Sequence, residues 1–427
     1  MGVVLIIVFL LALTIGVPVF ISMGISAFAA FLANGRIPLS QLPRLVFSGI
    51  NSFPLMSIPL FILAADIMTE GKLIDRLVRF CNDFLGHITG GLGHVNVVMS
   101  MIFGGISGSS VADAAGTGKL EMFMMRKAGY DPYYSGAMTA ASAVIGIIIP
   151  PSIPMVIYAL SDGKTSTMGL FAAGYIPGIL VGLALMAANA VISKKRGYKF
   201  NLKKKTAIEK IKSLWYALPG LIMPLLIIVC TVGGITTPTE AAAFAVAYAL
   251  FAGFLITKTL TFKMLIKILR ESAIMSAAIL MIVAMGSVFS WVLTYARIPQ
   301  TAGAWMGTLT TNPTIFLLLV AVLVIITGMF VDTIPAVMIL APIVSPMAAN
   351  FGINMFQIGL VVVIGIGIGM LTPPVAPLMF ITSSTGHLNL EKLIKATFPL
   401  LLTEVAVLFA VIFIPQLTTW LPGLLGY

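Results

Sequence analysis

The residues best suited to chemistry are two proline pairs that interrupt long apolar runs. They are Pro150-Pro151 and Pro373-Pro374. Proline lacks a backbone N–H, and its ring displaces the carbonyl one helical turn earlier from its hydrogen bond. An unpaired carbonyl in hydrocarbon is costly, so such a break persists only where protein, water or an ion satisfies the freed group. We therefore expect the backbone oxygens of residues 146–151 and 369–374 to act as ligands.

Two short polar segments offer the complementary half of each expected site. They run from Gly104 to Ser110 and from Gly328 to Thr333, and they supply hydroxyls, exposed backbone and glycine turns. Oxygen ligands of low formal charge suit Na⁺, and half-helix N-termini beside them suit an anionic carboxylate. The alternative is structural: proline pairs can simply kink a membrane helix, and glycine and serine can serve close helix packing.

Five acidic residues lie in or beside apolar runs and receive different interpretations. A charge inside the membrane costs roughly 3 kcal/mol or more, so Asp113 and Asp332 are site candidates, with a capped hairpin turn as the alternative. Glu240 ends the run Thr237-Pro238-Thr239-Glu240, which predicts a capping box at the start of a helix. Asp66 and Glu404 are interpreted as interface or partner contacts.

The overall composition places these residues in a membrane protein. Of the 427 residues 59% are hydrophobic and 9% charged, whereas soluble domains carry about 25% charged residues. The net charge of +11 does not indicate nucleic-acid binding, because nine of the 25 basic residues fall between Lys194 and Lys212, in a gap between apolar segments. That clustering is typical of a cytoplasmic loop. The two cysteines and three histidines have no metal-binding spacing.

The apolar segments repeat with a shift of 223 residues, the difference between positions 150 and 373. This shift aligns residues 105–163 with 328–386, and the three prolines of each break coincide. We therefore predict an all-α polytopic protein made of two repeats, residues 1–193 and 213–427, joined by a basic cytoplasmic linker at 194–212. The repeats should contain hairpins at about 95–127 and 313–349, and broken helices at 133–165 and 356–385.

The basic residues predict that the two repeats are inverted. Lys119, Arg126 and Lys127 lie in the first hairpin, whereas residues 298–386 contain no Lys or Arg. Positive-inside topology then places the ends of the first re-entrant hairpin in the cytoplasm, the ends of the second in the periplasm, and the N-terminus in the periplasm.

Two amphipathic stretches, 258–270, which is basic, and 388–395, are expected to be separate from the crossings 272–294 and 398–417.

With these breaks, the runs 104–113 and 237–242 resemble the large, DctM-type membrane subunit of tripartite ATP-independent periplasmic (TRAP) transporters. The resemblance covers essentially the whole chain. It implies an elevator-type carrier in the bacterial inner membrane, in which a transport domain of hairpins and broken helices slides against a scaffold. It also implies sodium-driven uptake of a carboxylate, either sialic acid or a C4-dicarboxylate. The implied partners are lipid, a small four-helix DctQ-type subunit, expected as a separate chain, and a DctP-type periplasmic binding protein.

The resemblance further implies two sodium sites and one solute site, with Na⁺ as the coupling ion and no organic cofactor. The first sodium site would comprise Gly104, Ser107, Ser109, Gly146, Ile149 and Pro151. The second would comprise Gly328, Asp332, Gly369, Thr372 and Pro374. The solute would lie near Ser109, Ser110, Asp113, Asp332 and Thr333. Neither polar segment contains Arg or Lys, so neutral donors and helix dipoles would hold the carboxylate.

Three alternative functions remain open from the sequence. They are a proton-coupled carrier that uses Asp113 or Asp332, a channel, and an intramembrane hydrolase. ATP hydrolysis is excluded at Gly116-Thr117-Gly118-Lys119, because the first glycine of a phosphate loop is replaced by Asp113 and its Ser or Thr by Leu120. We expect a transporter subunit and not an enzyme.

Overall fold

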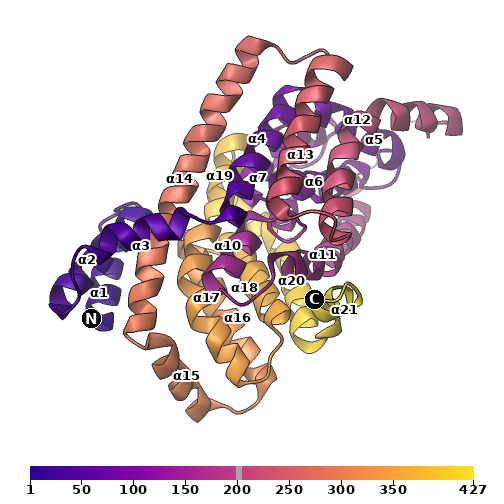
Figure 1. The fold of residues 1–427 in the computed structure, drawn as a ribbon. Helices are drawn as coiled ribbons and strands as arrows, with labels where there is room; N and C mark the ends of the chain where they lie inside the picture. Colours follow the sequence, from indigo (N-terminus) through magenta and orange to yellow (C-terminus); the bar gives the residue numbers. More distant parts are fainter. Residues whose placement is uncertain (199–203) are drawn as a thin grey trace.

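The computed structural model describes residues 1–198 and 204–427, and these residues form helices without any strand (Figure 1). Eight helices in this part of the chain are long and apolar enough to cross a membrane. The prediction of an all-α polytopic protein is therefore confirmed. The eight are Phe53–Glu70, Thr167–Arg196, Ala207–Val232, Pro238–Ile256, Phe262–Tyr295, Pro313–Phe330, Thr333–Asn350 and Leu390–Phe413.

The N-terminal helices and those of the chain's middle pack together as one group, which we call the frame. It contains α1 (Gly2–Thr14), α2 (Val19–Asn34), α3 (Gln41–Ile50), η1 (Phe53–Met56), α4 (Ser57–Glu70), α5 (Leu73–Leu85), α12 (Ala207–Val232), α13 (Pro238–Phe251), η3 (Ala252–Ile256) and α14 (Phe262–Tyr295). Helix α14 contacts α2, α3 and α4 in turn, while α13 packs on α4 and α12 on α5. In Figure 1, α14 is the long diagonal helix with α1–α3 on its outer side.

The remaining helices form the inner bundle, which contains the two broken helices. Its first part is α6 (Gly91–Ser107), α7 (Ser110–Ala115), α8 (Thr117–Lys127), α9 (Pro132–Ala143), η2 (Val144–Ile147), α10 (Ile153–Asp162) and α11 (Thr167–Arg196). Its second part is α16 (Pro313–Phe330), α17 (Thr333–Asn350), α18 (Met355–Met370), α19 (Pro377–Gly386), α20 (Leu390–Phe413) and α21 (Gln416–Leu424). Helix α15 (Ile298–Leu309) connects the frame to this second part and packs on α17.

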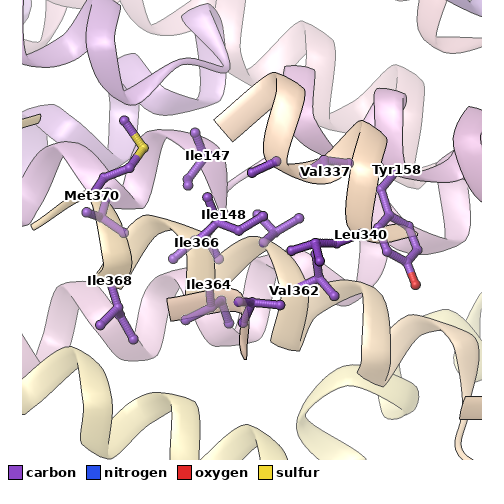
Figure 2. Close-up of a cluster of buried hydrophobic side chains, with 14 of the residues drawn as sticks. Ile147, Ile148, Tyr158, Val337, Leu340, Val362, Ile364, Ile366, Ile368 and Met370 are labelled. Atoms are coloured by element: carbon purple, nitrogen blue, oxygen red, sulfur yellow. The ribbon is translucent and has the colours of Figure 1, made fainter. Parts of the chain in front are cut away.

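The apolar core of the inner bundle joins residues from both halves of the chain. Figure 2 shows Ile147 and Ile148, at the first break, beside Ile364 and Ile366 of α18. Every residue of α18 from 357 to 370 is buried. Gly367 has no β-carbon, and one added there would lie only 2.7 Å from the side chain of Val144. This is closer than two carbon atoms normally approach, so the backbone at Gly367 touches the first broken helix. The two broken helices therefore pack directly against each other.

Two of the expected element boundaries are wrong. Residues 262–270 of the first stretch and the crossing 272–294 form one 34-residue helix, α14, and residues 390–395 are continuous with the following crossing in α20. Residues 262–285 contain no glycine or proline that would end a helix at the change from basic to apolar composition. The short helices α3 and α15 were not among the expected elements.

The predicted capping box at the start of α13 is confirmed. The Thr237 hydroxyl accepts a hydrogen bond from the Glu240 N–H at 3.3 Å, and the Glu240 carboxylate accepts one from the Thr237 N–H at 2.7 Å. Two otherwise unpaired backbone donors are satisfied by this exchange.

Candidate functional site

The first proline pair separates two helical segments and lies against the end of α6. Segment η2 ends at Ile147 and α10 begins at Ile153. The Ile147 carbonyl, freed by the break, accepts a hydrogen bond from the Ser152 hydroxyl at 2.6 Å, and Ser152 also caps α10. The Ile153 N–H donates to the Gly108 carbonyl at 3.1 Å. The break is therefore tied to the polar segment that follows α6.

Glycines allow this contact to be close. A β-carbon on Gly104 would lie 2.7 Å from the Gly146 α-carbon, and one on Gly146 would lie 3.3 Å from the Ser109 carbonyl oxygen. Gly108 has φ +64°, and a β-carbon there would lie 2.6 Å from the Pro151 carbonyl oxygen. A β-carbon on Gly105 would lie 3.7 Å from the Ile149 side chain, and the Ser107 hydroxyl accepts from the Ser109 N–H at 3.4 Å. The structure thus gathers all six residues expected at the first sodium site.

The second proline pair repeats this arrangement. Helix α18 ends at Met370 and α19 begins at Pro377. A β-carbon on Gly369 would lie 2.7 Å from the Gly328 α-carbon, and the Ala376 N–H donates to the Met329 carbonyl at 3.2 Å. Ala376 and Ile153, the two donors that join a break to its polar segment, are 223 positions apart.

Two of the other residues expected at the second sodium site, Asp332 and Thr372, are linked to the end of α18. The Asp332 carboxylate accepts from the Thr333 N–H at 2.7 Å, and the Thr333 hydroxyl contacts the Met370 sulfur at 2.9 Å. Thr372 donates to the Ile368 carbonyl at 2.7 Å. Pro374 is exposed, whereas Pro151 at the first break is buried.

A cavity of about 400 Å³ lies between the two polar segments and the frame. Four of the five residues expected to bind solute line it: Ser109, Ser110, Asp332 and Thr333. The opposite wall belongs to α4 and α14 and consists of Ile62, Ala65, Asp66, Glu271, Met275, Ala278, Ile279 and Ile282. Among the described residues that line the cavity there is no Lys or Arg.

Two helix N-termini open onto this cavity. Ile153 and Pro154 bring the start of α10 to its wall, and Asp332 and Thr333 bring the start of α17. The N-terminus of a helix carries a partial positive charge, which favours an anion nearby. The Ile153 and Thr333 N–H groups already donate to Gly108 and Asp332, and Asp66, Glu271 and Asp332 add negative charge to the walls. An anion in this cavity would therefore need a cation bound beside it.

Asp113 lies apart from the other expected solute residues. Val111, Ala112 and Ala115 of α7 line the cavity, whereas Asp113 is 1% exposed and accepts a hydrogen bond from Thr117 at 2.5 Å. It faces the interior of the first hairpin together with Glu121 of α8, which is 3% exposed. One oxygen of Asp113 and both oxygens of Glu121 have no hydrogen-bond partner within the described residues.

Two acidic residues, Asp66 and Glu271, lie on the frame side of the cavity. Asp66 accepts a hydrogen bond from Ser272 at 2.5 Å, and Glu271 forms an ion pair with Lys267 at 3.8 Å. From the sequence Asp66 is expected to be an interface or partner contact, and no role is expected for Glu271. Asp66 directly follows the apolar residues 62–65, and Glu271 precedes the largely apolar stretch 274–282. This position is the only sign in the sequence that the two residues face the inner bundle.

Comparison with known proteins identifies the family. The family model of the tripartite ATP-independent periplasmic transporter DctM component matches residues 6–417. The sialic acid TRAP transporter large permease protein SiaM of Vibrio cholerae is 37% identical over 413 residues, which cover 96% of each chain. The C4-dicarboxylate TRAP transporter large permease protein DctM of Pseudomonas aeruginosa is 34% identical, over 95% of this chain and 94% of its own. The isethionate permease DctMQ of Oleidesulfovibrio alaskensis is 35% identical, over 97% of this chain and 65% of its own.

The fold resembles that of a solved membrane transporter. The Alcanivorax borkumensis YdaH transporter superposes with a TM-score of 0.65 over 91% of this chain and 89% of its own, at 15% identity. That likeness concerns the fold alone. The family match spans nearly the whole chain, and it makes the protein a transporter component rather than an enzyme. The chain belongs to the DctM family, the large membrane component of the tripartite ATP-independent periplasmic transporters.

Proposed function

We propose that this chain is the sodium-coupled permease of a TRAP system and takes up a small organic anion. The observation that carries the proposal is the convergence of the first helix break, both polar segments and two helix N-termini on one cavity whose described lining has no basic side chain. The anion would bind at Ser109, Ser110, Asp332 and Thr333. Sodium bound at each break would offset its negative charge and that of Asp332.

The backbone supports two sodium sites of similar construction. In each half a glycine of the polar segment meets a glycine of the break, Gly104 with Gly146 and Gly328 with Gly369. Backbone oxygens made available in this way are suitable ligands for a weakly charged cation. Serine and threonine hydroxyls and the Asp332 carboxylate would complete the coordination.

Matching hydrogen bonds support two inverted repeats. The turn after the first hairpin contains a bond from the Tyr130 N–H to the Met125 carbonyl, and the turn after the second contains one from Ile353 to Ala348, both at 3.1 Å. The two donors, Tyr130 and Ile353, are 223 positions apart, and so are the two acceptors, Met125 and Ala348. The contrast in basic residues between the two hairpins supports opposite orientations in the inner membrane, with the N-terminus in the periplasm.

An elevator mechanism agrees with the division into frame and inner bundle. The inner bundle contains every residue of the proposed ion sites, while α4 and α14 supply only the opposite wall of the cavity. Asp66 and Glu271 lie near the basic stretch 258–270, which is the cytoplasmic end by the positive-inside rule. We therefore assign this arrangement to the state that faces the cytoplasm.

The relatives' names support the substrate class and the partners. They are named for sialic acid, C4-dicarboxylates and isethionate, all small organic anions. A DctQ-type small subunit and a DctP-type binding protein would complete the system. The test is uptake of radiolabelled sialic acid and succinate into proteoliposomes that contain both membrane subunits, with binding protein outside. Uptake that needs the binding protein and an inward sodium gradient supports the proposal, and uptake that is equal in potassium contradicts it.

Proton coupling is a second candidate, favoured by Asp113 and Glu121. Two carboxylates buried without a cation are strongly unfavourable, so a proton or a cation must accompany them. Uptake that persists without sodium and collapses with a protonophore would support this candidate. The Glu121→Gln variant should then lose the dependence on the proton gradient.

A further inference from the structure

Each half-helix that follows a proline pair ends on the hairpin of the other half of the chain. Helix α10 ends at Asp162, whose carboxylate accepts a hydrogen bond from Ser345 of α17. Helix α19 ends at Gly386, whose carbonyl accepts a hydrogen bond from the Arg126 guanidinium of α8 at 2.7 Å. We call these two contacts the crossed anchors.

The crossed anchors occupy corresponding places in the two halves. The shift of 223 residues between the two halves places Ser345 opposite Met122. Met122 lies one helical turn before Arg126 in α8, so the two anchor residues occupy neighbouring positions on corresponding hairpins. A β-carbon on Gly386 would lie 3.1 Å from the Met122 sulfur. Asp162 corresponds to residue 385, next to Gly386. Similar contacts at corresponding places indicate that the anchors are part of how the two halves are assembled.

Arg126 is well suited to hold the end of α19. The last carbonyls of a helix have no helical donor and carry partial negative charge, which a guanidinium complements. No carboxylate pairs with Arg126 within the described residues; its Nη2 donates to Gly386, and its buried Nε has no hydrogen-bond partner among them. The hydrogen bond to Gly386 is therefore the one specific polar contact that the structure gives this side chain.

The opposite end of α19 belongs to the second ion site. The Ala376 N–H, directly before this ten-residue helix, bonds to Met329 in the second polar segment. Thr372 and Pro374 lie two to four residues earlier. A short helix moves as a rigid rod, so a shift at Gly386 moves the backbone that would bind the ion.

We propose that Arg126, although it belongs to the first hairpin, is a positioning residue for the second ion site. It fixes the far end of α19 and so holds the backbone around Pro374 in the geometry that binds sodium. Ser345 holds α10 for the first site in the same way. The anchors thereby couple each ion site to the hairpin of the other half. This inference rests on the proposed sodium coupling.

The test compares Arg126→Gln with Lys127→Gln in the purified complex with the small subunit. Both variants lose one positive charge at the end of α8, but Lys127 is exposed and forms no ion pair or side-chain hydrogen bond among those found. Unfolding temperature is measured against sodium chloride at constant ionic strength with choline chloride. The readout is the sodium concentration that gives half of the stabilisation.

Arg126→Gln should raise the half-saturating sodium concentration about three- to tenfold. This change is smaller than the full effect of losing a charge-assisted hydrogen bond, because only part of that loss is passed on to the ion site. Lys127→Gln should leave it unchanged. Ser345→Ala should raise it as well, because it releases the other anchor. A purely structural role would lower the unfolding temperature equally at every sodium concentration, and that result would overturn the inference alone. A wild-type protein without any sodium-specific stabilisation would overturn both the proposed sodium coupling and this inference.

Discussion

Gly104→Ala and Gly105→Ala form a matched pair that probes the contact between α6 and the first break. A β-carbon at position 104 would lie 2.7 Å from the Gly146 α-carbon and 3.2 Å from its nitrogen, and both atoms are backbone. A β-carbon at position 105 would lie 3.5 Å from the Pro150 carbonyl oxygen, an ordinary contact. The two substitutions add the same methyl group to adjacent residues of one helix.

The difference between them can be worked out from these distances. Relief of the contact at Gly146 requires a backbone shift, and such overpacking costs about 1–3 kcal/mol. Replacing glycine by alanine within a helix returns about 0.5–1 kcal/mol in both variants. We therefore expect Gly104→Ala to disfavour the contact between α6 and the first break by a net of about 0–2.5 kcal/mol, which at the midpoint is roughly eightfold, and Gly105→Ala to be neutral or slightly stabilising.

The assay is sodium-dependent uptake in proteoliposomes, together with sodium-dependent thermal stabilisation of the purified complex. Gly104→Ala should raise the half-saturating sodium concentration in both measurements by about the factor derived above. Gly105→Ala should match the wild type within about twofold. If the two variants behave alike, or if Gly104→Ala retains the sodium dependence of the wild type, the close contact of Gly104 with Gly146 has no part in sodium binding.

Three further predictions concern single side chains. Asp332→Asn retains a side chain that can cap α17 but loses the charge. The unfolding temperature should therefore change little, while the half-saturating sodium concentration for uptake should rise at least about tenfold. Wild-type sodium dependence would exclude Asp332 as a ligand. Thr237→Ala removes the cap of α13 and should cost about 1 kcal/mol, seen as a lower unfolding temperature without altered sodium dependence; an unchanged temperature would contradict this. Cys81 of α5, which is outside the eight candidate spans, is 2% exposed, and burial, followed by the charge of Glu121, raises the pKa of its thiol to about 12. Because the thiolate is the reactive form, maleimide at neutral pH should label Cys81 only after denaturation, as mass spectrometry would detect.

The features that follow from local chemistry could be predicted from the sequence. The interruptions at Pro150 and Pro373 follow from the missing N–H of proline, and the capping box at Thr237 follows from residue types at fixed spacing. The family resemblance placed Gly104 and Gly146 in one expected site, and the structure brings their backbones into contact.

The features that depend on tertiary packing could not. The cavity wall formed by Asp66 and Glu271 arises because α4 and α14 lie opposite the polar segments, and neither helix carries a pattern that specifies this neighbour. Asp113 turns away from the cavity because α7 presents Val111, Ala112 and Ala115 to it, and that choice of face is fixed by the packing of a six-residue helix. The Arg126 contact joins residues 260 positions apart, far beyond any local signal.

Sodium ions that complete the backbone at both helix breaks should be visible in density maps of the complex with its small subunit, obtained by electron cryo-microscopy in sodium chloride and in choline chloride. We expect a sodium-dependent density peak beside the contact of Gly104 with Gly146 and another beside the contact of Gly328 with Gly369, each surrounded by protein oxygens. Maps that are alike in the two salts at both positions, with the backbone oxygens paired to protein groups, would exclude sodium binding at the breaks.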